Sequence, residues 1–216
     1  MNVRTDTFII SRYGWDFIAP LGILTLLLLL SIGFELLTFI LILLLSFIIY
    51  IHRNPERISA FAQDGSILSC LDGNVKEIIS IDKSPIDGKP GFEIVLETGY
   101  LDLAVLRAPI SSIMSIDKLQ RGTMVSLKSS HSNLNENASI RFSSSVGDVL
   151  VYHKLDSWTR PLRFAIEDEI MQNQRYGFML SGKTSIFLPS NSRVAIKEGM
   201  SLKAGESVIG FFSETA

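Results

Sequence analysis

Residues 17–51 read FIAPLGILTLLLLLSIGFELLTFILILLLSFIIYI and contain a single charged residue, Glu35. As one helix, these 35 residues would extend roughly 50 Å, whereas the hydrocarbon core of a bilayer is about 30 Å thick. Two shorter helices joined by a turn at 31–35 fit better. Gly33 relaxes the backbone there, and Glu35 then lies at the headgroup level, where a carboxylate costs less than at the bilayer centre. The stretch predicts an N-terminal transmembrane α-hairpin.

Three other interpretations of this stretch are a re-entrant wedge, a single long tilted helix and a signal peptide. The signal peptide fits worst, because the apolar stretch is too long and is not followed by a small-residue cleavage site. The wedge and the single helix stay open as alternatives to the hairpin.

The charges that flank the apolar stretch predict its orientation. Arg4 and Arg12 precede it, and His52, Arg53 and Arg57 follow it, whereas the turn between the two runs has no positive charge. By the positive-inside rule, both ends face the cytoplasm. This places the rest of the chain on the cytoplasmic face of the membrane, with the basic residues at the lipid headgroups.

Composition limits the classes of function that the chain can have. The formal net charge is −2, without the clustered basic face that a nucleic-acid partner requires. Cys70 is the only cysteine, which excludes an intrachain disulfide and a CxxC-type metal site. We therefore expect no metal and no nucleic acid, and we divide the chain into a tail at 1–14, the hairpin at 15–52 and a soluble domain at 53–216.

The soluble domain is predicted to be mainly β. Its apolar runs are short and are broken by Gly, Asp, Asn and Ser, and none keeps a 3.6-residue period over three turns. The polar segments 82–91 and 129–137 are expected to be loops. The expected strands are 67–71, 75–81, 92–96, 101–106, 124–127, 140–142, 149–153, 176–180, 185–188, 193–196 and 207–212.

The C-terminal residues 188–210 resemble a biotinyl- or lipoyl-like half-barrel, with glycines placed for tight hairpins. No lysine there has the Met-Lys-Met context that a carrier domain needs. The likeness is therefore to the fold and not to the carrier function.

Five motifs, in the same order and at matching separations, make the chain resemble the short, membrane-anchored bacterial type of the phosphatidylserine decarboxylase family. They correspond to the family's FRNPER, SPADG, VHVNRAP, NER and ERFG…FLP. In this chain they are HRNPER at 52–57, SCLDG at 69–73, LAVLRAP at 103–109, NEN at 135–137, and RYGF at 175–178 with FLP at 187–189.

The resemblance implies a self-processing chemistry. In the family, an Asp and a His activate the serine of a Gly-Ser step, the chain breaks there, and the new N-terminus becomes a pyruvoyl group. That group forms a Schiff base with phosphatidylserine and acts as the electron sink for decarboxylation.

The same resemblance implies that the processing site is degenerate here. Asp72 keeps the acid, but Ala104 occupies the histidine position. Counting back from FLP puts Gly182 at the serine and Ser181 at the preceding glycine. A methyl group cannot relay a proton, and a glycine has no hydroxyl with which to attack. Without a histidine, Asp72 either keeps an acid–base role or only caps the turn before Gly73.

Other residues could replace the missing pair. Ser181 is one position out of register, and its attack would make Leu180-Ser181 the cleaved bond. His131 and His153 could in principle serve as the base, but we expect both to be exposed on the surface. Thr184 and Ser185 also lie nearby, and Ser185 falls in an expected strand.

The sequence therefore leaves three functions open, and whether the protein is an enzyme stays undecided. The first is a non-self-processing homologue, without a cofactor, that binds membrane phospholipid of phosphatidylethanolamine metabolism, as a homo-oligomer or paired with an active homologue. The second is an active, pyruvoyl-dependent decarboxylase, a carboxy-lyase, cleaved before Ser181. The third is a membrane scaffold without lipid chemistry, because fold alone does not determine function.

Overall fold

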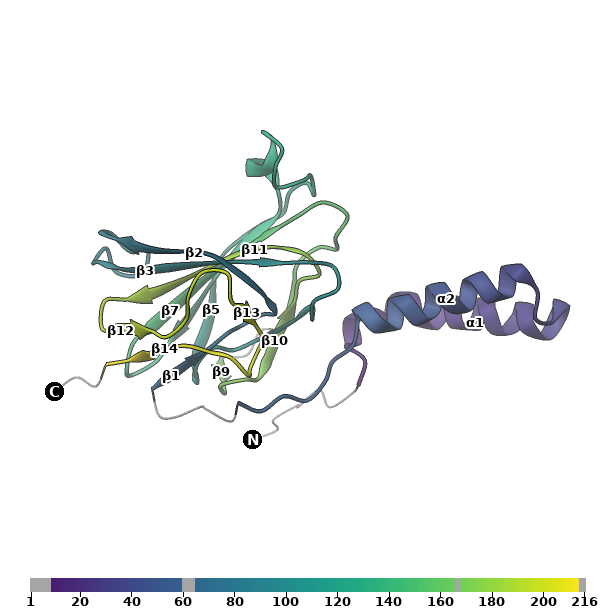
Figure 1. Cartoon of the computed structure of the whole chain (residues 1–216), viewed down its shortest axis with the longest axis horizontal. Helices are drawn as coiled ribbons and strands as arrows, with labels where there is room; N and C mark the ends of the chain where they lie inside the picture. The colour runs from purple at the N-terminus through teal and green to yellow at the C-terminus, as the bar shows by residue number, and fades with distance from the viewer. Residues whose placement is uncertain (1–8, 60–64, 166–167, 214–216) are drawn as a thin grey trace. The chain divides into compact units, whose positions relative to one another are not determined.

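The computed structural model describes residues 9–59, 65–165 and 168–213, and the chain divides into two compact units, Met1–Glu56 and Arg57–Ala216. Arg4, which supports the predicted orientation, lies outside the described residues. The first unit is helical and the second is built of β-strands (Figure 1).

Two helices form the first unit. After a 3₁₀ turn at Arg12–Gly14, α1 runs over Trp15–Ile32 and α2 over Leu36–Ile51. They lie side by side, and the Leu45 side chain packs at Gly22. The two helices are joined by a tight turn at Gly33, as expected. Gly33 has a φ of 77°, and the Thr38 hydroxyl donates to its carbonyl at 3.0 Å.

The helical unit is apolar on its outer surface. Large side chains such as Leu30, Leu36 and Leu43 are exposed. By length and composition, the helix at Arg12–Ile32 is able to cross a membrane, and α2 is a shorter apolar helix. A helix that is apolar all round needs an apolar surrounding, which a bilayer provides.

The first unit extends a few residues past the expected boundary at 52/53. The Ser11 amide donates to the His52 carbonyl at 2.8 Å, and the Asn54 amide donates to the Ile9 carbonyl at 2.7 Å. These bonds hold His52 and Asn54 against the start of the hairpin, and the second compact unit begins at Arg57.

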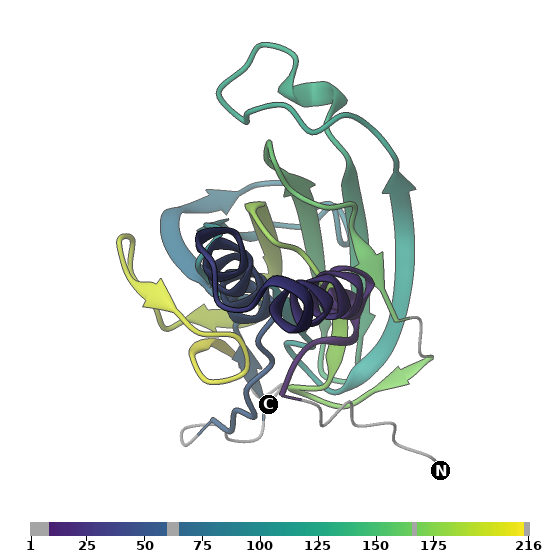
Figure 2. The same ribbon diagram turned by 90° about the vertical axis from the view of Figure 1, so that its right-hand side faces the viewer.

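The β domain contains one eight-stranded antiparallel sheet, in the order β13-β2-β3-β11-β7-β6-β5-β9, and two small sheets, β1-β14-β12 and β4-β10-β8. In Figure 2 the strands curve around the centre of the domain. The strands are β1 Ser66–Leu68, β2 Gly73–Ile81, β3 Gly91–Thr98, β4 Val105–Arg107, β5 Ser112–Gln120, β6 Asn137–Ser143, β7 Asp148–Leu155, β8 Arg163–Phe164, β9 Glu169–Ile170, β10 Arg175–Phe178, β11 Gly182–Pro189, β12 Ser192–Val194, β13 Ser201–Leu202 and β14 Val208–Phe212.

Strand β11 is the strand around which the candidate site is arranged. It pairs with β3 along its whole length and with β7 from Gly182 to Phe187. Thr184, Ile186 and Leu188 are buried, whereas Lys183 on the opposite face is exposed and Phe187 is half-buried. This alternation places Gly182 on the core-facing side, because residues two apart lie on one face of a strand.

The mainly β prediction is confirmed, with differences in detail. Strand β5 was missed because most of its side chains are exposed, so that its apolar residues form no continuous run. Residues 124–127 are not a strand, and of 101–106 only the last two belong to β4. Gly199 and Gly205 have the positive φ expected of hairpin glycines. The half-barrel likeness stays a prediction.

Candidate functional site

The fold brings together the chain segments that carry the four motif positions. The Thr98 hydroxyl donates to the Asp72 carbonyl at 2.7 Å, and the Ser181 hydroxyl donates to the Thr98 carbonyl at 3.2 Å. The Met179 amide donates to the Ala104 carbonyl at 2.8 Å. Gly182 follows Ser181 as the first residue of β11. The ends of β3 and β10, the start of β11 and the turn before β2 therefore meet at one place.

The Asp72 carboxylate is bound by a cation and a backbone amide. Both of its oxygens accept from the guanidinium of Arg57, with Nη2 to Oδ2 at 2.9 Å, and Oδ1 also accepts from the Ala204 amide at 2.8 Å. Both side chains are only 11% exposed. A bidentate, largely buried Arg–carboxylate pair is strong and directional. In this structure Asp72 therefore ties Arg57, at the start of the β domain, to the turn between β13 and β14.

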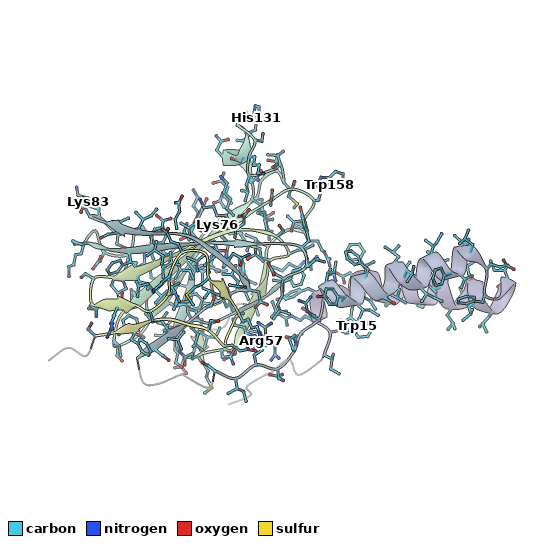
Figure 3. The ribbon with its side chains drawn as sticks, viewed as in Figure 1. Trp15, Arg57, Lys76, Lys83, His131 and Trp158 are labelled. Carbon is cyan, nitrogen blue, oxygen red and sulfur yellow. The ribbon has the colours of Figure 1, made fainter. Side chains whose placement is uncertain are left out.

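Arg57 was expected at the lipid headgroups, but its side chain is turned into the domain. Its Nε also lies 3.4 Å from a carboxylate oxygen of Glu206, and its carbonyl accepts from the Asn173 side chain. Asn173 in turn accepts from the buried Arg107 at 3.1 Å. Figure 3 labels Arg57 on the β domain. The sequence carried no signal for this pair, since Arg57 and Asp72 are 15 positions apart with no common element.

Ala104 and Gly182, whose side chains can neither transfer a proton nor act as a nucleophile, are both closely packed. Ala104 is fully buried. A Cβ added at Gly182 would lie 2.3 Å from the carbonyl oxygen of Lys154, which belongs to the neighbouring strand β7. No real Cβ contact is so short, so any side chain at 182 requires β7 or β11 to move. The backbone spacing of these two strands thus requires glycine at this position.

Ser181, the displaced candidate nucleophile, is buried, and its hydroxyl donates to a carbonyl. Its own carbonyl accepts from the Asp156 amide at 3.2 Å. In the described part of the chain, none of the hydrogen bonds found for a histidine side chain goes to Ser181. These residues do not fit a pyruvoyl group, because hydroxyl and base are not paired.

The prediction that His153 is exposed is wrong, whereas His131 is exposed as expected. His153 is fully buried, with Nδ1 2.8 Å from the Thr184 hydroxyl and Nε2 2.8 Å from the Tyr176 hydroxyl. The signal was present in the sequence. Val149, Val151, His153 and Leu155 alternate along β7, so that His153 lies on the core-facing side.

A buried polar network therefore runs from Thr184 through His153 and Tyr176 toward Cys70. Burial lowers the pKa of His153 to about 3 and raises the pKa of the Cys70 thiol to about 12, so the imidazole and the thiol are both neutral. The network is a satisfied core feature. Ser185, one residue past Thr184, is also buried in β11.

The NEN motif is structural. The Asn135 side chain donates to the carbonyls of Val125 at 2.6 Å and Leu155 at 2.9 Å. The Glu136 carboxylate accepts from Arg121 and from the Leu162 amide. These bonds fasten the loop that projects from the sheet to the end of β7. Within the described ranges, no group of three or more His, Cys, Asp or Glu side chains is placed to bind a metal.

The fold defines the class of this protein as a β domain joined to an N-terminal hairpin of apolar helices, in which the segments of Asp72, Ala104 and Ser181 meet at one place. Relatives of similar length are found among curated proteins. The chain is 27% identical to a phosphatidylserine decarboxylase proenzyme of Desulfotalea psychrophila, over 93% of this chain and 95% of the relative. It is 26% identical to proenzymes of the same name from Carboxydothermus hydrogenoformans, over 95% and 97%, and from Syntrophus aciditrophicus, over 97% and 100%.

Similarity over nearly the whole chain to several such proenzymes supports a relation to the phosphatidylserine decarboxylase family. This relates it to phospholipid metabolism. No family model and no solved structure matches it.

The Arg57–Asp72 pair is expected to stabilise the domain. We expect Asp72→Asn to lower the free energy of unfolding by about 3 kcal/mol, because it leaves a largely buried guanidinium without its counter-charge. Arg57→Met with Asp72→Leu should cost less than the two single changes together, since neither charge remains. The measurement is thermal or urea unfolding of the full chain in mild detergent.

The exposed pair Lys76–Glu97 is the matched control for that experiment, with side chains 53% and 49% exposed. We expect Lys76→Met to cost less than about 1 kcal/mol. Equal effects at the two pairs would contradict the role assigned to Asp72.

His153 should make stability depend on pH. Its pKa is lowered from 6.5 to about 3 in the folded chain, so the unfolded chain takes up a proton first as the pH falls. Stability is therefore fully present above about pH 6.5 and falls by up to about 1.4 kcal/mol per pH unit below it. Urea unfolding at a series of pH values between about 5 and 7 measures the slope, in a range where His153 titrates and most carboxylates do not. His153→Gln should remove this slope, and His131→Gln, at an exposed position, should leave it unchanged. A slope that survives His153→Gln would contradict the assignment.

Proposed function

We propose that this protein is a membrane-tethered homologue of phosphatidylserine decarboxylase that binds phospholipid headgroups without processing itself. The observation that carries the proposal is the pair of residues at the family's histidine and serine positions, Ala104 and Gly182. Neither has an ionisable or nucleophilic group, and the backbone of β7 leaves Gly182 no room for one. In this proposal the protein forms no pyruvoyl group.

The acid that the family uses supports the same proposal. Asp72 is bound by Arg57 and by the Ala204 amide, so its oxygens are occupied by structural bonds. In a self-processing chain this carboxylate would instead orient a histidine. The two arginines of this region, Arg57 and Arg107, are likewise held by Asp72 and Asn173.

An active decarboxylase cut at Leu180-Ser181 is the second candidate. The Ser181 hydroxyl just before β11 favours this candidate. That hydroxyl, however, is buried and donates to the Thr98 carbonyl. Both ring nitrogens of His153 are bonded to Thr184 and Tyr176. A base would have to reach Ser181 from another part of the chain.

The proposed location is the cytoplasmic face of a bacterial inner membrane. Basic residues flank both ends of the hairpin and none lies in its turn, which supports an orientation with both ends inside. A pairing with a second copy or with an active homologue belongs to the proposal, because a binding domain without its own chemistry can serve an enzyme that has it.

Cleavage tests the proposal directly. We expect the purified full chain to remain a single species of 24.0 kDa by intact mass spectrometry. The Desulfotalea psychrophila relative, expressed in the same way, checks that the conditions permit processing.

Detection of a C-terminal fragment of residues 181–216, blocked to Edman chemistry and lost in Ser181→Ala, would instead establish the active enzyme. That fragment has 36 residues.

Headgroup binding separates the proposal from a membrane scaffold. We expect glycerophosphoserine or glycerophosphoethanolamine to bind saturably to the detergent-solubilised full chain in isothermal titration calorimetry. Glycerophosphocholine, which shares the phosphate but lacks a primary amine, is the matched control and should bind more weakly. If none of the three binds, the scaffold interpretation is favoured.

A further inference from the structure

Trp158 is exposed to an unusual degree. It lies in the loop between β7 and β8 with 92% of its surface accessible, and Figure 3 shows its side chain pointing away from the β domain. Its φ is 53°, a left-handed conformation that is unfavourable for a bulky side chain. The loop thus holds a large apolar ring in water in a backbone conformation that costs energy. Such an arrangement indicates a surface that is covered in the working protein.

A second loop places two more such side chains beside it. Leu101, in the connection from β3 to β4, is 60% exposed, and Tyr100 next to it is also exposed. The Tyr100 hydroxyl donates to the carbonyl of Ser157, the residue before Trp158. This bond joins the two loops, so Tyr100, Leu101 and Trp158 form one edge of the domain, here called the aromatic edge.

The acidic residues of both loops are turned toward the backbone. Asp102 accepts from the Gly99 amide at 2.8 Å, and Asp156 accepts from the amides of Leu127 at 3.0 Å and Ser157 at 2.7 Å. The same segment continues with Arg160 and Arg163, and Arg163 is exposed. A surface of Trp, Tyr and Leu beside arginines suits the boundary between headgroups and acyl chains of an anionic membrane.

A bilayer is within reach of this surface because the connection to the hairpin is short. Only residues 52–56 separate the end of α2 at Ile51 from Arg57, which Asp72 holds in the β domain. Even a fully extended chain of this length spans only about 20 Å. The hairpin, by its length and composition, places that end of α2 near a membrane surface.

We propose that the aromatic edge inserts into the headgroup region of the bilayer and docks the β domain on it. The edge also borders the candidate site. Tyr100 lies two residues after Thr98, whose carbonyl accepts from the Ser181 hydroxyl, and the backbone amide of Asp156 donates to the Ser181 carbonyl. Docking would bring lipid headgroups close to that site. This last step rests on the proposed headgroup binding, whereas docking itself does not.

The test uses the full chain with Trp15→Phe, which leaves Trp158 as the only tryptophan. Reconstituted in vesicles of phosphatidylcholine and phosphatidylserine, Trp158 should be quenched by lipids brominated on the acyl chains and shielded from iodide in the aqueous phase. The same chain in detergent micelles that lack brominated lipid gives the baseline.

Lys83 offers a matched control at the opposite end of the sheet. It is exposed, and the eight residues of β3 separate its loop from Tyr100 by about 25 Å (Figure 3). Lys83→Trp in a chain with Trp15→Phe and Trp158→Phe should show several-fold weaker quenching by brominated lipid and full access to iodide. Circular dichroism checks that each variant is folded.

Three outcomes overturn docking. In the first, Trp158 is as accessible to iodide as the tryptophan at 83. In the second, the two tryptophans are quenched equally by brominated lipid. In the third, Trp158 is shielded from iodide without quenching by lipid, which would assign the edge to a protein partner or a second copy. None of these results depends on cleavage of the chain or on headgroup titration, so failure of docking and failure of the proposed function are distinguishable.

Discussion

Strand β11 is hydrogen-bonded on both sides, to β3 and to β7, and much of the remaining structure depends on this double pairing. It sets the separation of the backbones at Gly182, where a Cβ would meet the Lys154 carbonyl. It also places Thr184 opposite His153 and thereby closes the buried polar network in the core. A strand in the middle of a sheet cannot shift by one residue without turning its core side chains to the other face. The register that stabilises the domain is therefore also the register that leaves no space at 182.

The second constraint is the ion pair of Arg57 and Asp72. In a self-processing relative the acid would take part in activating a nucleophile, but here it holds a guanidinium and a backbone amide. A largely buried charge pair of this kind is costly to break, because either partner alone would be left without its counter-charge. The carboxylate of Asp72 is thus engaged in structural bonds in this structure.

Membrane attachment and the candidate site are connected through the ends of the strands. The turn after β3 carries Tyr100 and Leu101, and the turn after β7 carries Trp158. The strands that lead into these turns also flank Ser181. The backbone of β3 and β7 therefore supports both the aromatic edge and the segment that contains Ser181.

The sequence by itself determined the apolar hairpin, the mainly β class and the family. These depend on local composition, on periodicity and on motif order, all of which are readable along a chain. It also carried the alternation that buries His153, although that signal was read as a surface histidine. Only the tertiary structure decided the partner of Asp72, the crowding at Gly182 and the joining of the two loops at Tyr100 and Trp158. Each of these depends on residues that lie far apart in sequence and meet only when the sheet forms. No local sequence pattern therefore predicts them.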